Sequence, residues 1–380
     1  MVVGISTVMD SVWIISHRYF NSSYCRNCST REINMLQSNF QTLLKGYKPG
    51  TPQRCGVMTL IPILTDKPYQ EVGAVGEISL YKDPEYQRME FKNDSNKISI
   101  IPHGFMFLTA EHAQDRVVNS AHLAKAGAIT SVDVDCLQPS QGGHLQPGLK
   151  EWRLLPSALK LAAWSHAGDN QYDSLWNDMR SYLSNAGVSG GELIMFYKHF
   201  QKDLDEFVAQ FEPVTNQVGA IILFGNEVAG IEIVPNYEIW KEMWKPLVRD
   251  SYGADAIVLV KKGYSQANRP LINVDQIHTF EDLEGAVADI MENNVAFARS
   301  VMGSVLNEVV MAEQKEMLDD LTLYDFTSSN YKGQAVMHGP EHFIYVTAVP
   351  ASSKEVTQPR REFSATWNDQ NPYSGNDFSI

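Results

Sequence analysis

Between residues 50 and 140, the chain consists of short apolar or alternating segments separated by turn residues. The run 56–64 (GVMTLIPIL) is continuously apolar and is followed by a turn at 66–68, which is typical of a buried strand. Segment 130–136 (TSVDVDC) alternates polar and apolar residues with the period of two expected for a strand. Further strands are expected at 77–81, 97–102 and 104–109.

From 151 to 212 the pattern changes to helical spacing. Pro156 suits the first turn of a helix over 157–165, and a second helix is expected at 172–186. The clearest helix covers 191–211, where aromatic and aliphatic residues recur every three or four positions and predict a core-facing stripe. They are Leu193, Phe196, Tyr197, Phe200, Leu204, Phe207, Val208 and Phe211.

The last part of the chain mixes both patterns. Segments 217–224 and 227–234 flank Gly225-Asn226, which predicts a hairpin with a primed turn because both residues tolerate positive φ. A helix is expected over 237–252, kinked or divided at Pro246. The remaining predictions are a strand at 256–260, helices at 280–301 and 304–321, and strands at 334–337 and 342–349.

These elements predict an α+β protein with one compact body. The body is expected to cover 50–350, as a β-rich part (50–140), a helical part (151–212) and a mixed part (217–350). Residues 1–34 differ in character and are interpreted as an extension that need not belong to the fold. The polar segment 352–380 is expected to be flexible.

Composition narrows the functional classes. Of the 380 residues, 44% are hydrophobic and 20% are charged, as in a soluble globular protein, and the net charge is −14. An acidic surface repels phosphate backbones, so we expect no general nucleic-acid binding. No apolar run is long enough for a membrane helix, so we expect no membrane partner and a cytoplasmic location. Cys25 and Cys28 form a lone CxxC pair, interpreted as free thiols.

The triplet Gln114-Asp115-Arg116 follows a predicted strand and is a candidate ligand site. Arginine there could bind a phosphate or carboxylate with two hydrogen bonds, and Gln114 could read a base or ribose edge. The alternative is that Asp115 and Arg116 form a structural ion pair.

Asp133 and Asp135 project from one strand face, which favours a solvated surface unless Arg116 lies across the sheet from them.

A second group of candidates lies further along the chain. Glu232 stands between Ile231 and Ile233 and therefore faces away from both, so it is either a general base or an outward polar residue. Arg249 and Tyr252 follow near the end of a predicted helix and could contact a ligand. Arg249 could instead satisfy terminal carbonyl groups. No metal-ligand spacing, glycine-rich phosphate loop or hydrolase elbow is present, so the sequence indicates no metal site and names no cofactor.

Four stretches, in order, resemble a known family, the type-one domain associated with ADP-ribosyl glycohydrolases and rhodanese-phosphatases (ARPP). They are 56–64, 112–136 (HAQDRVVNSAHLAKAGAITSVDVDC), 217–257 with its hairpin, acidic residue, helix and Arg-Ser-Tyr segment, and 333–346 (GQAVMHGPEHFIYV). Two features depart from the family pattern. LTAEHAQDR replaces its Gly-Glu segment, and Cys136-Leu137-Gln138 lacks the expected glutamate and the arginine that follows.

The resemblance implies an α+β fold and a role near molecules derived from NAD or ADP-ribose, in a prokaryotic or phage conflict setting. We therefore expect binding or processing of a small phosphate-containing nucleotide derivative by a homo-oligomer. In this hypothesis Arg116 and Arg249 hold anionic oxygens, Gln114 and Tyr252 orient the ligand, and Asp115 or Glu232 is the acid–base group. Two alternatives stay open, a self-assembling scaffold or virion protein without catalysis, and a sponge that sequesters a nucleotide signal.

Overall fold

The hairpin at the middle of the sequence forms the middle of a large antiparallel sheet. In the computed structural model, β14 (Gln217–Phe224) pairs with β15 (Glu227–Ile233). Gly225 has φ 61°, the positive value that the first central residue of a type II′ turn requires. The structure describes residues 13–15, 35–85, 87–108, 115–137, 144–165, 172–264, 276–339 and 342–352.

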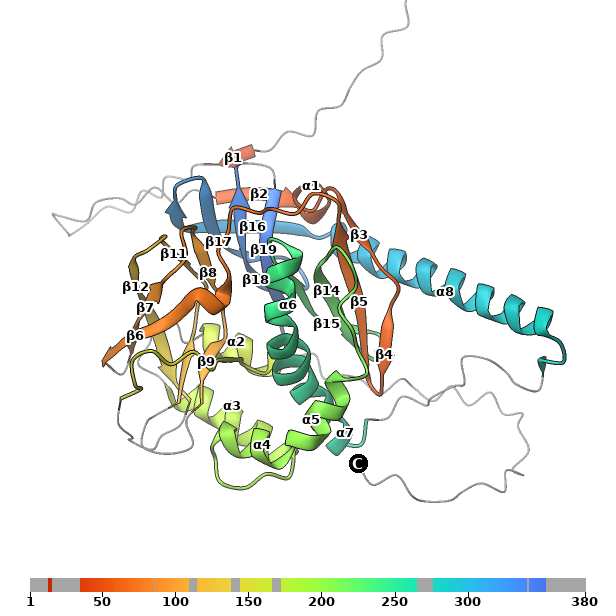
Figure 1. The fold of residues 1–380 in the computed structure, drawn as a ribbon, viewed down its shortest axis with the longest axis horizontal. Coiled ribbons are helices and arrows are strands. Elements are labelled where there is room, and N and C mark those ends of the chain that lie inside the picture. The colour runs from red at the N-terminus through yellow and green to blue at the C-terminus, as the bar shows by residue number, and fades with distance from the viewer. Residues whose placement is uncertain are drawn as a thin grey trace, which may run out of the picture.

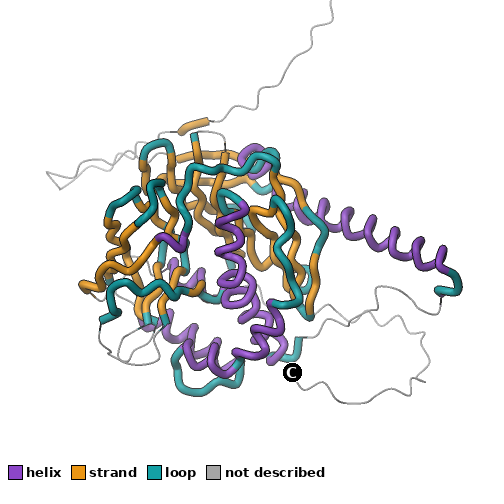
Figure 2. Tube along the Cα trace, viewed as in Figure 1, coloured by secondary structure: helices purple, strands orange, loops and turns teal. Residues whose placement is uncertain are grey.

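Eleven strands of the described residues make up this sheet (Figures 1 and 2). Its interior joins strands that are distant in the sequence, because β19 hydrogen-bonds to β15. The order is β1 (Trp13–Ile15), β2 (Met35–Asn39), β16 (Val309–Leu318), β17 (Leu321–Thr327), β18 (Tyr331–His338), β19 (His342–Pro350), β15, β14, β5 (Met58–Thr65) and β3 (Tyr47–Pro49), with β4 (Gln53–Cys55) also on β5.

The β-rich segment predicted at 50–140 supplies most of two smaller sheets. Among the described residues, six strands pair in the order β13 (Arg153–Leu154), β9 (Phe105–Phe107), β10 (Arg116–Val118), β12 (Ile129–Cys136), β7 (Arg88–Asn93) and β6 (Ile78–Glu85). A further pair joins β8 (Ser99–Ile101) to β11 (His122–Ala124).

In the middle of the large sheet, at β14, both faces are buried. In β14, Ala220 and Ile222 face a core shared with the smaller sheets and α6 (Tyr237–Lys245), whereas Ile221 and Leu223 face the opposite side. That opposite side is covered by α1 (Phe40–Leu43) and the C-terminal half of α8 (Phe280–Leu306). A third core lies under the remaining helices, α2 (Ser157–Ser165), α3 (Tyr172–Asn185), α4 (Leu193–His199), α5 (Gln201–Val208) and α7 (Ala254–Lys261).

Pro246 divides the helix predicted over 237–252. α6 ends at Lys245, and a π-helical segment, Pro246–Gly253 (labelled η2 below), connects it to α7. Proline lacks the backbone N–H that would continue the α-helical pattern, and every residue from Leu247 to Gly253 is buried. The wider π turn therefore directs consecutive polar side chains into the interior.

Three predicted elements need correction. The segment 256–260 is not a strand but part of α7, since a short apolar run fits a buried helix equally well. The helix predicted at 304–321 is wrong beyond Leu306, because β16 follows with Val310 and Ala312 buried and Val309 and Met311 more exposed. The helix predicted at 191–211 is interrupted at Phe200.

The boundaries of the body also differ from expectation. Residues 35–49 belong to it, because β2 pairs with β16 and the side chain of Phe40 is fully buried. Apart from β1, the expected extension at 1–34 lies outside the described residues. The expected flexible tail lies outside them from residue 353 onward.

Candidate functional site

A row of polar side chains crosses the face of the large sheet that is directed toward the smaller sheets and α6. Directly paired residues in neighbouring strands point to the same face, and the pairs Gln334–Thr347 and Thr347–Glu232 follow each other across β18, β19 and β15. All three residues are at most 4% exposed. Polar side chains inside an apolar core destabilise a protein unless they are hydrogen-bonded. The hydrogen-bond partners of this row therefore show which other residues belong to the site.

Glu232 lies at the centre of this row. Its Oε1 accepts hydrogen bonds from Lys160 Nζ at 2.6 Å and from Tyr252 Oη at 2.7 Å. Lys160 Nζ also lies 3.4 Å from the Thr347 hydroxyl. Side chains from α2 and η2 thus converge on a carboxylate of β15, while β19 contacts the lysine, and we call Lys160, Glu232 and Tyr252 the buried triad.

The absence of a side chain at position 230 makes this arrangement possible. Gly230 lies on the same face of β15 as Glu232, and a Cβ there would come within 1.9 Å of the Tyr252 hydroxyl. Burial and the nearby Glu232 raise the pKa of Tyr252 well above its usual value. The phenol therefore stays protonated and donates to the carboxylate.

A second carboxylate holds the helix that carries Lys160. Asp255 accepts hydrogen bonds from the Ser157 hydroxyl at 2.5 Å and the Ala158 backbone N–H at 3.0 Å, both in the first turn of α2. Burial raises the pKa of Asp255 to about 6. A carboxylate at a helix N-terminus satisfies free N–H groups, so Asp255 fixes the position of Lys160.

Tyr345 and His103 lie beside the triad. Tyr345 is two residues before Thr347 on β19 and accepts a hydrogen bond from the backbone N–H of His103. Burial, together with Glu232, raises the pKa of Tyr345 well above its usual value. His103 stacks edge-on against Trp164, and burial, with a smaller effect from Lys160, lowers its pKa to about 3. The imidazole is therefore neutral.

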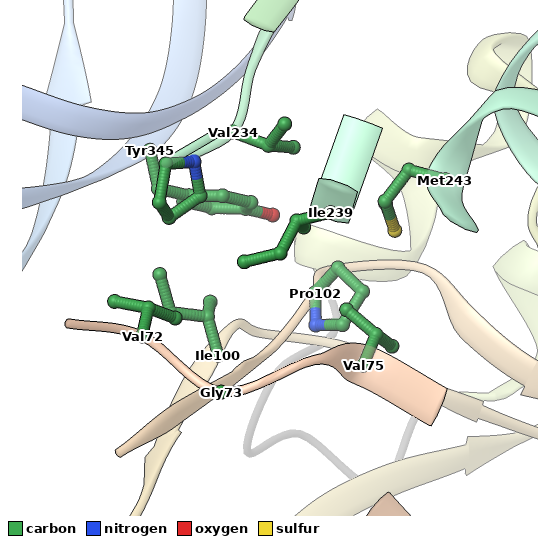
Figure 3. A pocket seen from close by; sticks show the side chains of 10 residues that line it. Val72, Gly73, Val75, Ile100, Pro102, Val234, Ile239, Met243 and Tyr345 are labelled. Atoms are coloured by element: carbon green, nitrogen blue, oxygen red, sulfur yellow. The ribbon is translucent and has the colours of Figure 1, made fainter. Parts of the chain in front are cut away.

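An apolar pocket reaches Tyr345 from the surface. Figure 3 shows it between the segment carrying Val72 and Val75, the strand end at Ile100, and α6. The cavity between these side chains is small, about 10 Å³, and it opens to solvent. The ring of Tyr345 forms one wall, so the pocket and the buried triad share this residue. The other lining residues are Gly73, Pro102, Val234, Pro235, Ile239 and Met243.

The two candidate arginines are engaged with carboxylates. Arg249 Nε donates to Asp205 at 2.6 Å, and its Nη1 pairs with Asp250, which also receives Arg153. The pKa of Arg249 is raised: burial lowers it, but the paired carboxylates outweigh that effect.

Arg116 is fully buried, with its Nη1 3.1 Å from Cys136 Sγ and its Nε 3.9 Å from Asp83.

Of the two aspartates predicted on one strand face, only Asp135 is buried. Asp133 is exposed, whereas Asp135 accepts a 3.3 Å hydrogen bond from Asn119. Arg116 pairs in register with Cys136 and Val117 with Asp135, so Arg116 points to the opposite face from Asp135. Burial raises the pKa of Asp135 to about 7.

The structure thus brings together Glu232 and Tyr252 but not the whole predicted set. Arg116 begins β10 in the six-stranded sheet, directly after Asp115, and Arg249 forms ion pairs with Asp205 and Asp250. Gln114, Cys25 and Cys28 lie outside the described residues.

Within the described ranges, no group of three potential ligands could hold a metal ion, and no helix has the length and apolar content to cross a membrane.

Sequence reasoning missed Lys160, Tyr345 and His103. The signal for Lys160 was present, since it is the one cation in the apolar helix SALKLAAWS. A lysine on a buried helix face requires a buried anion, and Glu232 was available on a strand with apolar neighbours. No signal identified Tyr345, whose role depends on which strand pairs with β15.

The order and pairing of these elements define an α+β domain with an internal acidic centre and an adjoining pocket. A family model, the ARG and Rhodanese-Phosphatase-superfamily-associated Protein domain (ARPP-1), matches residues 46–325. The chain belongs to this family, as the resemblance in the sequence implied. Comparisons with curated proteins and with solved structures returned no match.

Proposed function

We propose that this chain binds a small nucleotide derivative of the NAD or ADP-ribose class beside the buried triad. The family's name associates it with ADP-ribosyl glycohydrolase proteins, which supports the ligand class. The observation that carries the proposal is the Glu232 carboxylate, which is 4% exposed and hydrogen-bonded by Lys160 and Tyr252, next to a pocket open to solvent. Buried ionisable groups beside a pocket are typical of functional sites.

The pocket suits the uncharged ring of such a ligand better than its phosphates. Its walls are apolar apart from the Tyr345 hydroxyl, and Met243 is an unbranched side chain that can move to admit a ring. Because Arg116 and Arg249 already contact carboxylates, the proposal gives them structural roles. The phosphates would lie toward solvent, and Glu232 would be the acid–base group of any reaction.

The test is mass spectrometry of small molecules after incubation with NAD, ADP-ribose, cyclic ADP-ribose or cyclic dinucleotides. We expect one of them to be retained on the protein or converted, and retention to be lost when Val75→Phe fills the pocket. Val309→Phe, on the exposed side of β16, is the matched control and should leave binding intact.

Glu232→Gln separates binding from chemistry. It keeps the shape of the side chain and removes its charge. Conversion that stops while retention persists would identify Glu232 as the acid–base group. If the wild-type protein retains and converts none of these molecules, the proposed ligand class is wrong.

A further inference from the structure

The N-terminal half of α8 projects from the body with an apolar face exposed. Figure 1 shows that no described element packs against this half. Five of the apolar side chains of α8 repeat every three or four residues and are at least 36% exposed, reaching 69% at the helix start. They are Phe280, Leu283, Val287 and Met291, with Val295 at the boundary to the body-facing half, and we call these five the α8 stripe.

The stripe continues the face by which α8 packs on the body. At about 100° per residue, its five members fall within about 120° of the helix circumference. Ala298, Met302 and Val305 fall within the same arc and are at most 3% exposed. One apolar face is therefore buried in the C-terminal half and lacks a described partner in the N-terminal half.

The projecting half is built as a regular helix. Thr279 caps its N-terminus, accepting a hydrogen bond from Asp282 N–H, while the Asp282 carboxylate accepts from Thr279 N–H. At the point where the helix leaves the body, Arg54 donates to Asn294 at 2.7 Å and lies over the ring of Phe297. The stripe is thus held in a fixed direction.

The charges around the stripe have one sign. Between residues 280 and 298 there is no lysine or arginine, but there are five carboxylates, Glu281, Asp282, Glu284, Asp289 and Glu292. A second copy would bring an equally acidic helix against it, and five side chains are few beside the roughly 20–30 residues a side of a stable interface. A groove that wraps the helix adds contacts beyond the five side chains of the stripe, and basic residues on its rim pair with the surrounding carboxylates.

We propose that the N-terminal half of α8 is a docking helix for a partner protein with an apolar groove rimmed by lysine or arginine. Amphipathic helices dock in this way through anchors at i, i+3, i+4 and i+7. Burying the stripe supplies the affinity, and the carboxylates select a basic rim. The pocket beside the triad takes no part in this interaction.

The probe is a synthetic amphipathic helix about 20 residues long, with leucine on one face and lysine on the rest. Binding to the full-length chain is followed by fluorescence anisotropy at several salt concentrations. We expect binding that weakens with salt, no binding of the same helix with glutamate in place of lysine, and a loss of about tenfold or more for Val287→Ser/Met291→Ser.

The serine substitutions change no charge, so they separate the stripe from the general attraction of an acidic protein for a basic peptide. Asp289→Asn, on the opposite side of the helix, should weaken binding much less. Equal binding by wild type and the serine variant would overturn the proposal. So would sedimentation velocity showing that the wild-type protein self-associates and the serine variant does not, because the stripe would then pair with a second copy.

Discussion

At the scale of single residues, the buried triad joins three elements through one ion pair and one hydrogen bond. Lys160→Met would leave the Glu232 carboxylate in the core without its cation. Removing one partner of a buried ion pair destabilises a protein by about 3–5 kcal/mol, and we expect a loss of that size in the free energy of unfolding from urea denaturation. The double variant with Glu232→Gln should recover part of this loss, because no buried charge is left.

Lys48→Met is the matched control for this prediction. Lys48 and Asp66 also form a close pair, at 2.9 Å, but both side chains are more than two-thirds exposed. Water screens such a pair, so its removal should leave stability almost unchanged. Equal effects of the two substitutions would show that the triad is not electrostatically coupled.

Asp135 provides a pH-dependent prediction. Burial raises its pKa from 3.8 to about 7, so between these values the folded protein binds a proton that the unfolded chain has released. Folding stability then falls as the pH rises through this window, since stability decreases wherever the folded state binds more protons. Asp135→Asn removes this dependence, and the variant should gain stability relative to wild type from about pH 4 to about pH 7.

Urea unfolding of both proteins across this pH range measures the difference directly. Asn119 remains available as a hydrogen-bond partner for the new amide, so the substitution keeps the local geometry. Parallel stability curves for the two proteins would show that Asp135 titrates normally in the folded state.

The sequence singles out Glu232 and Tyr252 as candidate residues, but it indicates neither their contact nor the part that Lys160 takes in it. Glu232 between Ile231 and Ile233 is polar on a strand that is otherwise apolar, a pattern visible without a structure. Its pairing with Lys160 spans 72 positions, and the approach of Tyr252 depends on Gly230 and on a π turn. Such contacts between distant segments are fixed by tertiary packing rather than by local spacing.

At the scale of elements, predictions succeed where local chemistry is decisive. Both strands of the central hairpin follow from the Gly225-Asn226 turn, and α8 begins at Phe280, where the predicted helix over 280–301 begins. Predictions fail at 256–260 and beyond Leu306, where short apolar stretches fit a helix or a strand equally well. In these places burial on a neighbouring element decides the structure.

The hairpin turn gives a prediction at this scale. Gly225 has φ 61°, and a side chain in this region costs about 1–2 kcal/mol, so Gly225→Ala should lower the free energy of unfolding by about that amount. Gly303, in the body-facing half of α8, has no neighbour within 4 Å of an added Cβ. Gly303→Ala should instead stabilise by about 0.5–1 kcal/mol, because alanine is the better helix former.

Thermal and urea unfolding of the two variants compares the same substitution in two backbone conformations. Opposite signs are expected. Destabilisation by both would mean that the space beside Gly303 is needed for packing, and stabilisation by both would mean that the turn can relax into another type.

At the scale of the whole molecule, the body is larger than the region matched by the family model. The match covers 46–325 and ends within β17. β18 and β19 lie beyond it, yet they occupy the sheet between β17 and β15. Before it, Phe40, Leu43 and Leu44 are at most 2% exposed and fill the core under α8. The sheet therefore depends on both ends of the described body.

A fragment limited to 46–325 should consequently fail to fold. It lacks two interior strands, so β17 keeps β16 but loses its other partner, β18, and the row from Gln334 through Thr347 to Glu232 is broken. A fragment spanning 35–352 keeps every strand from β2 to β19 and should unfold cooperatively at nearly the temperature of the full chain. Circular dichroism during heating and the dispersion of amide NMR signals distinguish the two. Cooperative unfolding of the shorter fragment would show that β14, β15 and β5 form a stable sheet without β18 and β19. The polar row would then not be required for the rest of the sheet to fold.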